Sequence, residues 1–287
     1  MNTRVLALSL MALAVVLTAG WLLGRGSISQ AAPVDLQAEA DIPSHDRFTA
    51  VLQEVVQPPR VDYARLLTRK GQLDAYLDAL ARTAPEALAS ADRDEALAFW
   101  INAYNACMLD LVLDHYPIES GGAGLLGAIR ARVAGYPDNS VWQIREVFTR
   151  RHCVVAGTAR SQDEIEHDII RPTFQDPRIH FAVNCAAVSC PVLWPRAYSP
   201  GSLDEELDRA VRNLMDSPEH FRLDRTSPAT LTLNKVLDWY SDDFGGTEGL
   251  KEFLARYLEG DDRELVLRPD TRVEFFEYEW TLNDVNG

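Results

Sequence analysis

Two stretches of the chain are apolar almost without interruption, and they predict two different kinds of helix. The first covers residues 5–23 and is flanked by Arg4 and Arg25. A signal peptide has an apolar core of about 7 to 15 residues, whereas a membrane-spanning helix needs about 17 to 25. The run fits a cleaved signal peptide, with Ser-Gln-Ala at residues 29–31 as the cleavage site, or an uncleaved anchor. We therefore expect residues 1–31 to be a signal peptide or N-terminal membrane anchor.

The second apolar stretch, residues 96–115, carries apolar side chains on nearly every side of a helix. Asp92 and Glu95 form a capping box before it, and Pro117 follows its end. A helix that is apolar all round is buried in the protein. We expect this helix to lie at the centre of the domain.

Shorter patterns complete the fold prediction. Further helices are predicted at residues 62–80, 141–148, 161–171, 203–215, 236–240 and 250–258, with Asp62 and Ser202 as caps of the first and the fourth. Short strands are predicted at residues 152–156, 179–184, 221–223, 230–233, 265–267 and 273–278, and those at 221–223 and 230–233 are expected to form a hairpin. Strands and helices do not alternate regularly, which favours an α+β fold over a doubly wound one. We expect a single domain at residues 46–287, after a linker at 32–45, with a central buried helix, surrounding helices and a small, mostly antiparallel sheet.

The charge of the chain argues against one class of partner. The formal net charge is −15, and removing the two basic residues of segment 1–31 leaves −17 on the remainder. Such a domain repels nucleic acid and anionic membrane surfaces. We expect no nucleic-acid partner, no cofactor, and membrane contact through the N-terminal segment alone. The expected location is periplasmic or secreted, or anchored to the inner membrane by residues 5–23.

The best candidate for chemistry is a cysteine at the end of a predicted strand, where a thiol can be exposed while its backbone is held. Cys185 follows the strand at 179–184, and the backbone N–H groups of residues 186–189 would form an oxyanion hole. A catalytic thiol also needs an imidazole base and a group that orients it. His180 or His167 would be the base, and Glu166 would be the orienting carboxylate. Strand alternation places His180 and Cys185 on opposite faces, which keeps His167 open as the alternative.

The four cysteines allow other interpretations. Cys185 and Cys190 would form a disulfide in an oxidising compartment. The same two thiols with His180, and with Glu166 or His167 as a further ligand, would form a zinc site, but their spacing matches no strong zinc pattern, so no metal is predicted. Cys107 and Cys153 are expected to be buried apolar thiols.

Several polar residues are candidates for substrate binding. Arg171 and Arg178 would clamp a carboxylate of a peptide-like or amino-acid substrate, unless they pair with neighbouring carboxylates as scaffolding. Asn102 and Asn105, on the central helix, would orient a substrate or a catalytic group, or tie down loop backbone. Asn184, next to the candidate nucleophile, is a further candidate.

Four ordered segments resemble the family of domains of unknown function numbered 547 (DUF547), in its bacterial exported form. They read AFWINAYNA, IEHDIIRP, DPRIHFAVNCAAVSCP and EYEWTLND, at residues 98–106, 165–172, 176–191 and 277–284. The resemblance runs from about Phe48 to the C-terminus. It implies that Cys185 and Glu166 match recurring family residues, whereas the position of Cys190 often holds another residue, which weakens the disulfide interpretation. The histidine matching His180 belongs to the bacterial form, and the family has no established activity.

The leading hypothesis from the sequence is a cysteine-dependent hydrolase or acyl or peptidyl transferase that acts on an unidentified small molecule or peptide. Cys185 would be the nucleophile, His180 or His167 the base, and Glu166 the orienting group. The alternatives are a non-catalytic binding or scaffold domain of the cell envelope and a zinc site.

Overall fold

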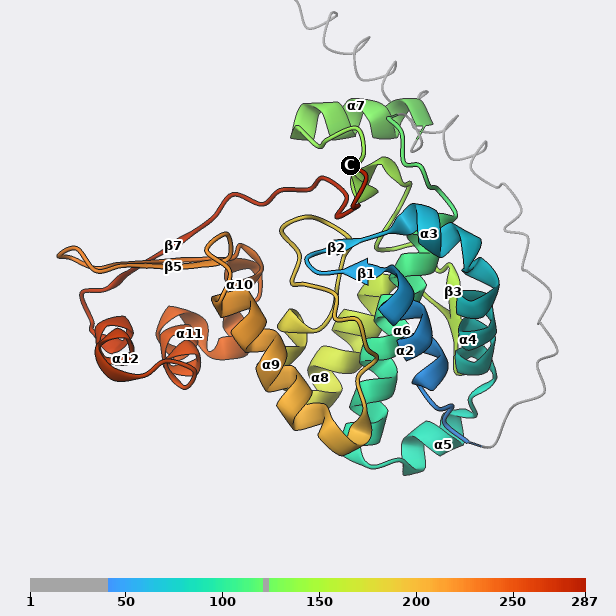
Figure 1. Ribbon diagram of the computed structural model, residues 1–287, viewed down its shortest axis with the longest axis horizontal. Helices are drawn as coiled ribbons and strands as arrows, with labels where there is room; N and C mark the ends of the chain where they lie inside the picture. The colour runs from blue at the N-terminus through green and yellow to red at the C-terminus, as the bar shows by residue number, and fades with distance from the viewer. Residues whose placement is uncertain (1–40, 121–123) are drawn as a thin grey trace, which may run out of the picture. The chain divides into compact units, whose positions relative to one another are not determined.

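The predicted central helix is α6, Arg93–Leu113, in a computed structural model that describes residues 41–120 and 124–287 (Figure 1). Asp92 caps it by accepting the backbone N–H of Glu95 at 2.8 Å. Every residue from 97 to 109 is buried. Among the described residues α6 is long and apolar enough to cross a membrane, but 89% of its apolar window is buried inside the protein. It is therefore the core helix that its sequence pattern predicts.

Some predictions concern residues outside the described part of the chain. The export segment at 1–31 and most of the linker at 32–45 lie there, as do three residues of a glycine-rich stretch, 121–123. The described residues belong to one compact unit. The fold within that unit is α+β, as predicted, and helix predominates over strand.

The N-terminal elements pack around α6 (Figure 1). They are α2 (Asp46–Val55), β1 (Val56–Gln57), β2 (Arg60–Val61), α3 (Tyr63–Thr68), α4 (Lys70–Arg82) and α5 (Pro85–Ser90). The predicted cap at Asp62 is confirmed, because its carboxylate accepts the N–H of Arg65 at 2.8 Å. Phe48 of α2 and Tyr76 of α4 stack with ring centroids 4.9 Å apart, which joins these helices within the core.

Two secondary-structure predictions in the middle of the chain are wrong: residues 141–148 form only a 3₁₀ turn at 141–143 and not a longer helix, and segment 179–184 is not a strand. Its elements are α7 (Gly124–Ala134), η1 (Val141–Gln143), β3 (Cys153–Val155), β4 (Thr158–Arg160), η2 (Glu164–Ile170), α8 (Arg171–Phe174) and η3 (Pro177–Phe181). Segment 179–184, predicted as a strand, instead begins within the 3₁₀ helix η3. Asp176 caps this helix by accepting the N–H of Arg178, and Pro177 fixes its first turn. These local signals prevail over the β-branched and aromatic content of the segment.

The C-terminal part builds a second apolar core on a three-stranded sheet. Its elements are η4 (Pro200–Ser202), α9 (Leu203–Met215), β5 (Phe221–Asp224), β6 (Thr230–Leu233), α10 (Val236–Trp239), η5 (Ser241–Phe244), α11 (Gly246–Ala255), α12 (Gly260–Leu267) and β7 (Arg272–Phe275). β6 pairs antiparallel with β5, as the predicted hairpin, and parallel with β7. Residues 265–267, predicted as a strand, are the last turn of α12.

Ser202, which the sequence suggests as the cap of α9, makes no capping bond. Its hydroxyl instead donates to the carboxylate of Glu206 at 3.0 Å. Glu206 also accepts the backbone N–H of Ser199 at 2.8 Å, so this carboxylate ties the start of η4 to the first turns of α9.

The closing segment of the chain runs back across the loop that follows η3. Val188 donates its backbone N–H to the carbonyl of Thr281 at 2.8 Å, and Asn283 donates to the carbonyl of Ala186 at 3.0 Å. On its other side, Asn283 accepts the N–H of Val61 at 2.9 Å. These bonds place the C-terminal residues between the N-terminal hairpin and the loop carrying Cys185, and so hold that loop in position.

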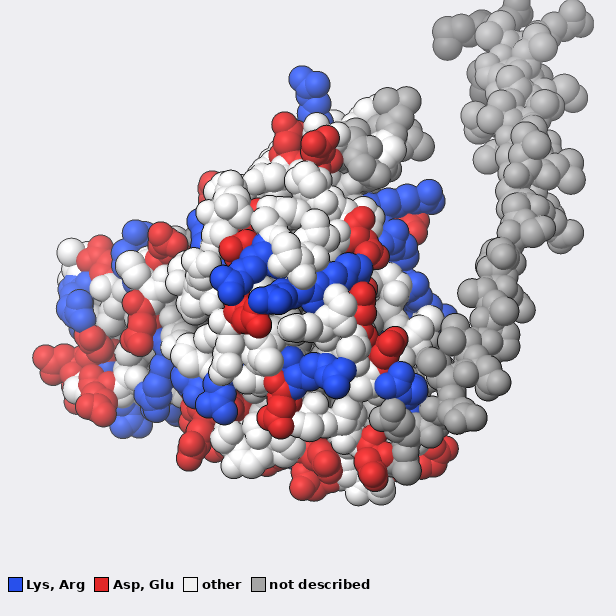
Figure 2. Space-filling model, turned by 45° about the vertical axis from the view of Figure 1, so that its right-hand side comes forward, with Lys and Arg blue, Asp and Glu red and all other residues white. Residues whose placement is uncertain are grey.

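The described surface mixes charges of both signs. On the face shown in Figure 2, Lys and Arg side chains lie beside Asp and Glu side chains, with uncharged surface between the groups. One exposed pair of this kind joins Arg225 to Asp262, with 2.7 Å between nitrogen and oxygen. The surface therefore balances many of its charges locally although the chain as a whole is acidic.

Candidate functional site

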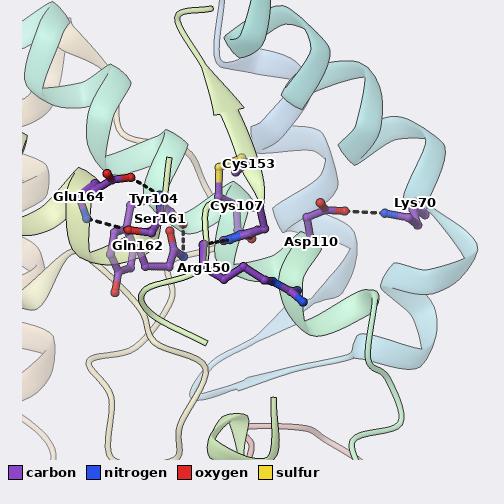
Figure 3. The surroundings of a disulfide bond; sticks show 10 residues. Lys70, Tyr104, Cys107, Asp110, Arg150, Cys153, Ser161, Gln162 and Glu164 are labelled. Atoms are coloured by element: carbon purple, nitrogen blue, oxygen red, sulfur yellow. Dashed lines mark hydrogen bonds and ion pairs between the residues drawn. A yellow bond between two sulfur atoms is a disulfide. The ribbon is translucent and has the colours of Figure 1, made fainter. Parts of the chain in front are cut away.

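A disulfide joins Cys107 of α6 to Cys153 of β3 (Figure 3). The expectation that both are unpaired buried thiols is therefore wrong. Burial does not distinguish a disulfide-bonded cysteine from a free thiol, because both kinds of cysteine are usually buried. The pairing links positions 46 residues apart. It leaves Cys185 and Cys190 as free thiols, so the alternative disulfide between those two is not formed.

All four candidate catalytic side chains line one cavity of about 350 Å³: those of Glu166, His167, His180 and Cys185. Most of the remaining wall is aromatic, from Tyr104, Tyr136, Trp142, Phe148, Trp239, Tyr240, Tyr278 and Trp280. The rings contact one another, as Trp239 and Tyr278 do with centroids 4.7 Å apart. The structure thus brings the four candidate residues to one cavity, and it adds an aromatic wall that the sequence analysis did not anticipate.

Cys185 is the half-buried thiol of the cavity, and its sulfur lies 3.1 Å from the hydroxyl oxygen of Tyr278. A hydrogen bond from the Cys190 thiol lowers the pKa of Cys185, against the effect of burial, and bonds from Tyr278 and the Ala187 N–H lower it further. Burial, reinforced by the neighbouring Cys185, raises the pKa of Cys190 well above its usual range. Of the two thiols, Cys185 therefore takes the thiolate form more readily.

The residue after Cys185 has an unusual backbone conformation. Ala186 is fully buried and has a φ of +65°, a region that alanine rarely enters. Its N–H donates to Oδ1 of Asn184 at 2.9 Å, and Nδ2 of Asn184 donates to the carbonyl of Pro191 at 2.7 Å. Asn184 thus holds the turn at Cys185, and its amide is not available for substrate.

The two asparagines of α6 tie down loop backbone, which is one of the two roles that the sequence leaves open. Asn105 accepts the N–H of Asn184 at 2.9 Å and donates to the carbonyl of Ala182 at 3.0 Å. Asn102 makes the same pair of bonds with Tyr198, at 2.9 and 2.8 Å. Both amides position the site through the backbone rather than by contacting substrate.

The predicted oxyanion hole in residues 186–189 is not free. The N–H groups of Ala186, Val188 and Ser189 donate to Asn184, Thr281 and Glu279 respectively. That of Ala187 is directed at the Cys185 sulfur. The loop therefore supports the thiolate, and the Tyr278 hydroxyl is the donor beside the sulfur that faces the cavity.

His180 is fully buried and is oriented by a carboxylate that the sequence analysis missed. Its Nε2 lies 2.7 Å from Oδ2 of Asp243, and its ring stacks on Tyr240 with centroids 4.0 Å apart. Glu166, the expected orienting group, instead faces Nδ1, with 3.9 Å between Nδ1 and Oε1. Within the described residues neither of these two atoms has a hydrogen-bond partner. Because His180 lies in η3 and not on a strand, the argument that placed it on the face opposite Cys185 no longer applies.

Asp243 lies 63 positions beyond His180, in η5. Hydrogen bonds from His180 and Arg171 hold the pKa of its carboxyl well below its usual range. No local motif marks this residue in the sequence, because its partners come from other elements.

His167 is already engaged at one ring nitrogen. Its Nδ1 lies 3.1 Å from a guanidinium nitrogen of Arg171, and since arginine can only donate, Nδ1 accepts. Its Nε2 lies 3.9 Å from the carboxylate of Asp163. His167 lies at the edge of the cavity and is less suited than His180 to take a proton there.

The two arginines are paired as scaffolding and do not line the Cys185 cavity. Arg171 makes a bidentate pair with Asp243, at 2.7 and 2.8 Å. Arg178 contacts three carboxylates, those of Asp176, Asp204 and Asp208. These contacts support the scaffolding alternative and not the carboxylate clamp.

The described residues contain no group of three or more His, Cys, Asp or Glu side chains arranged to hold a metal ion. The zinc alternative therefore gains no support from this part of the chain.

Residues 88–214 match the model of the family described as "Protein of unknown function, DUF547". The resemblance expected from the sequence is confirmed for this segment, which is less than half of the chain and includes Glu166, His180 and Cys185. Asp243 and Tyr278 lie outside it. No curated protein and no solved structure matches the chain. The family description names no activity, so a functional argument depends on the geometry of the cavity.

Proposed function

We propose that the cavity is the active site of a cysteine-dependent hydrolase or acyl transferase, with Cys185 as nucleophile and His180 as base. One observation carries the proposal. A free, half-buried thiol and an imidazole oriented by a carboxylate line the same cavity. These are the components that thiol acyl-transfer chemistry requires.

The surroundings of Cys185 suit a nucleophile. Donors from Tyr278, Cys190 and the loop backbone favour its thiolate, which is the reactive form of cysteine. The backbone at Ala186, where φ is positive, is held by the hydrogen bond that its N–H donates to Oδ1 of Asn184. Strained backbone of this kind is concentrated at functional sites, where the surrounding structure holds a reactive group in place.

The surroundings of His180 suit a base. A carboxylate such as Asp243 accepts but does not donate, so Nε2 carries the proton and Nδ1 keeps its lone pair. Asp243 also stabilises the imidazolium that forms when Nδ1 takes a proton. The expected base, His180, thus has an orienting group in Asp243 rather than in Glu166.

The proposed reaction has two steps. The Cys185 thiolate attacks the carbonyl carbon of an ester, the bond from that carbon to the leaving oxygen breaks, and the leaving oxygen takes a proton from water. An acceptor molecule then attacks the thioester and gives a proton to Nδ1 of His180, while the carbon–sulfur bond breaks and the thiolate re-forms. The imidazolium finally loses its proton to solvent. Tyr278 is placed to donate to the oxyanion in both steps.

Trapping of the acyl-enzyme tests this proposal. The full chain is treated with p-nitrophenyl acetate, quenched in acid and mapped by mass spectrometry. We expect one acetyl group, on Cys185, which Cys185→Ala abolishes. Cys190→Ala, its matched control, should keep the adduct at a lower rate because a donor to the thiolate is lost. Acetylation that is absent, or that persists in Cys185→Ala, would contradict the proposal and favour a binding or scaffold domain.

We also propose that the domain acts outside the cytoplasm, in the periplasm or as a secreted or membrane-anchored protein. The apolar run at residues 5–23 and the Cys107–Cys153 disulfide support this location, because stable disulfides form mainly in oxidising compartments. Protease protection of the full-length protein in intact cells and spheroplasts tests it. Protection that persists when the outer membrane alone is opened would contradict it.

A further inference from the structure

Apart from its histidines, the described charged side chains that line the cavity are acidic. The carboxylates of Asp163 and Glu166 line it together with the Cys185 thiol, whereas no described Lys or Arg does. The Glu166 side chain is 8% exposed, and its Oε1 has no hydrogen-bond partner among the described residues. A buried carboxylate oxygen without a donor is costly, so a ligand that supplies a donor would be bound favourably.

A second unpartnered acceptor lies next to Glu166. Nδ1 of His180 is 3.9 Å from Oε1 of Glu166, and the bond from Nε2 to Asp243 leaves Nδ1 as an acceptor. Two acceptors at this separation fit one small group that donates a hydrogen to each at about 2.9 Å. Water and a primary amine both meet that requirement.

The aromatic wall favours the amine. Faces of Trp and Tyr attract cations, and the attraction grows when the site excludes water. The rings of Trp239, Tyr278 and Trp280 contact one another at the cavity, with centroids 4.4 to 5.7 Å apart. A protonated amine is thus complementary to both the carboxylates and the rings, whereas a neutral water molecule can donate to the two acceptors but gains no cation–π attraction to the rings.

We infer that the acceptor substrate of this site is a primary amine, bound as its ammonium form between Glu166 and His180 and against the aromatic wall. The inference rests on the proposed function and makes the protein an amine acyltransferase. The ammonium gives one proton to Nδ1 of His180 and becomes a nucleophilic amine. The amine nitrogen attacks the Cys185 thioester, the carbon–sulfur bond breaks, and the amide forms. The second proton of the nitrogen passes to solvent, and Cys185 leaves as thiolate.

Binding of n-hexylamine, compared with 1-hexanol of nearly the same size, tests the ammonium site. Tryptophan fluorescence of the full chain and protection of Cys185 from iodoacetamide are the two readouts. We expect the amine to bind at least about tenfold more tightly than the alcohol, as for a hydrogen bond to a charged group. Glu166→Gln should reduce this preference to less than about threefold. Asp168→Asn, which changes an exposed carboxylate on the same helix, should keep it.

The results separate the inference from the proposed function. Equal binding of amine and alcohol by the unmodified protein overturns the ammonium site, and this comparison needs no variant that must fold. A preference for the amine that survives Glu166→Gln also overturns it. If p-nitrophenyl acetate with n-hexylamine acetylates Cys185 but yields acetate and no N-hexylacetamide above the uncatalysed rate, the transferase role fails and the hydrolase proposal stands. If amine binding is confirmed while Cys185 resists acylation, the proposed function fails and the ammonium site stands.

Discussion

Nε2 of His180 lies 2.7 Å from Oδ2 of Asp243, which joins the segment that matches DUF547 to a residue outside it. The bond fixes which imidazole nitrogen carries the proton and leaves the other one toward Glu166 and the cavity. Arg171 holds the same carboxylate through two further bonds. The base of the proposed site therefore depends on the C-terminal part of the chain as well as on the family segment.

Asp243→Asn should lower the free energy of unfolding at pH 7 by about 1 to 2 kcal/mol, because a partly exposed carboxylate loses bonds to His180 and Arg171. The pKa of Asp243 is lower in the folded protein than in the unfolded chain, so its contribution is full above about pH 4 to 5. The contribution is lost as pH falls below about 4 toward the folded pKa. Urea denaturation at pH 7 and pH 3 measures both values.

Asp242→Asn is the matched control, because it removes an exposed carboxylate from the adjacent position. It should change stability by less than about 0.5 kcal/mol at either pH. A difference between wild type and Asp243→Asn that stays constant or grows toward pH 3 would contradict the assigned pKa direction.

Replacing both Cys107 and Cys153 by alanine should lower the free energy of unfolding by about 3 to 4 kcal/mol. The disulfide closes a loop between positions 46 residues apart, and its loss releases that loop in the unfolded chain. Chemical denaturation of the oxidised protein and the double variant gives the difference. A loss below about 1 kcal/mol would show that the bond is not formed in the native protein.

Ala186→Gly should cost less stability than Ala187→Gly, by about 1 kcal/mol. Both alanines are buried, so both changes remove a buried methyl group. Ala186 alone of the two has a positive φ, where glycine is relaxed and alanine is not. Parallel denaturation of the two variants tests the conformation at Cys185, and an equal or larger loss for Ala186→Gly would contradict it.

Tyr278→Phe should raise the pKa of Cys185, because the thiolate loses a hydrogen-bond donor. The pH at which alkylation reaches half its maximum rate should rise with it. Tyr136→Phe removes a hydroxyl from another ring of the cavity and should leave the profile unchanged. Equal shifts in the two variants would contradict a specific hydrogen bond from Tyr278 to the Cys185 sulfur.

The sequence predicted those parts of the fold that depend on local signals. Asp92 and Asp62 cap helices where they were expected to, and the continuous apolar pattern identified α6 as the core. Segment 179–184 was assigned to a strand because its apolar content suits either state, and the cap at Asp176 decided the outcome. Local sequence signals of this kind do not show which distant residues contact one another in the folded protein.

The sequence analysis also identified those site residues that lie close together in the chain, and it missed those that come from distant elements. Glu166, His180 and Cys185 lie within twenty positions of one another, and local density was enough to identify them. Asp243 and Tyr278 were missed because they reach the cavity from distant elements, 63 and 93 positions from the residues that they contact. Cys107 and Cys153 were misassigned for the same reason, since only the packing of β3 against α6 brings them together.

The pH dependence of iodoacetamide alkylation, mapped residue by residue in the native full chain, tests the central claim most directly. We predict that Cys185 is alkylated ahead of Cys190, with half of its maximal rate reached below the ordinary thiol pKa of about 8.5. An unreactive Cys185, a disulfide between Cys185 and Cys190, or a midpoint at or above about 8.5 would contradict the account of Cys185 as an activated nucleophile.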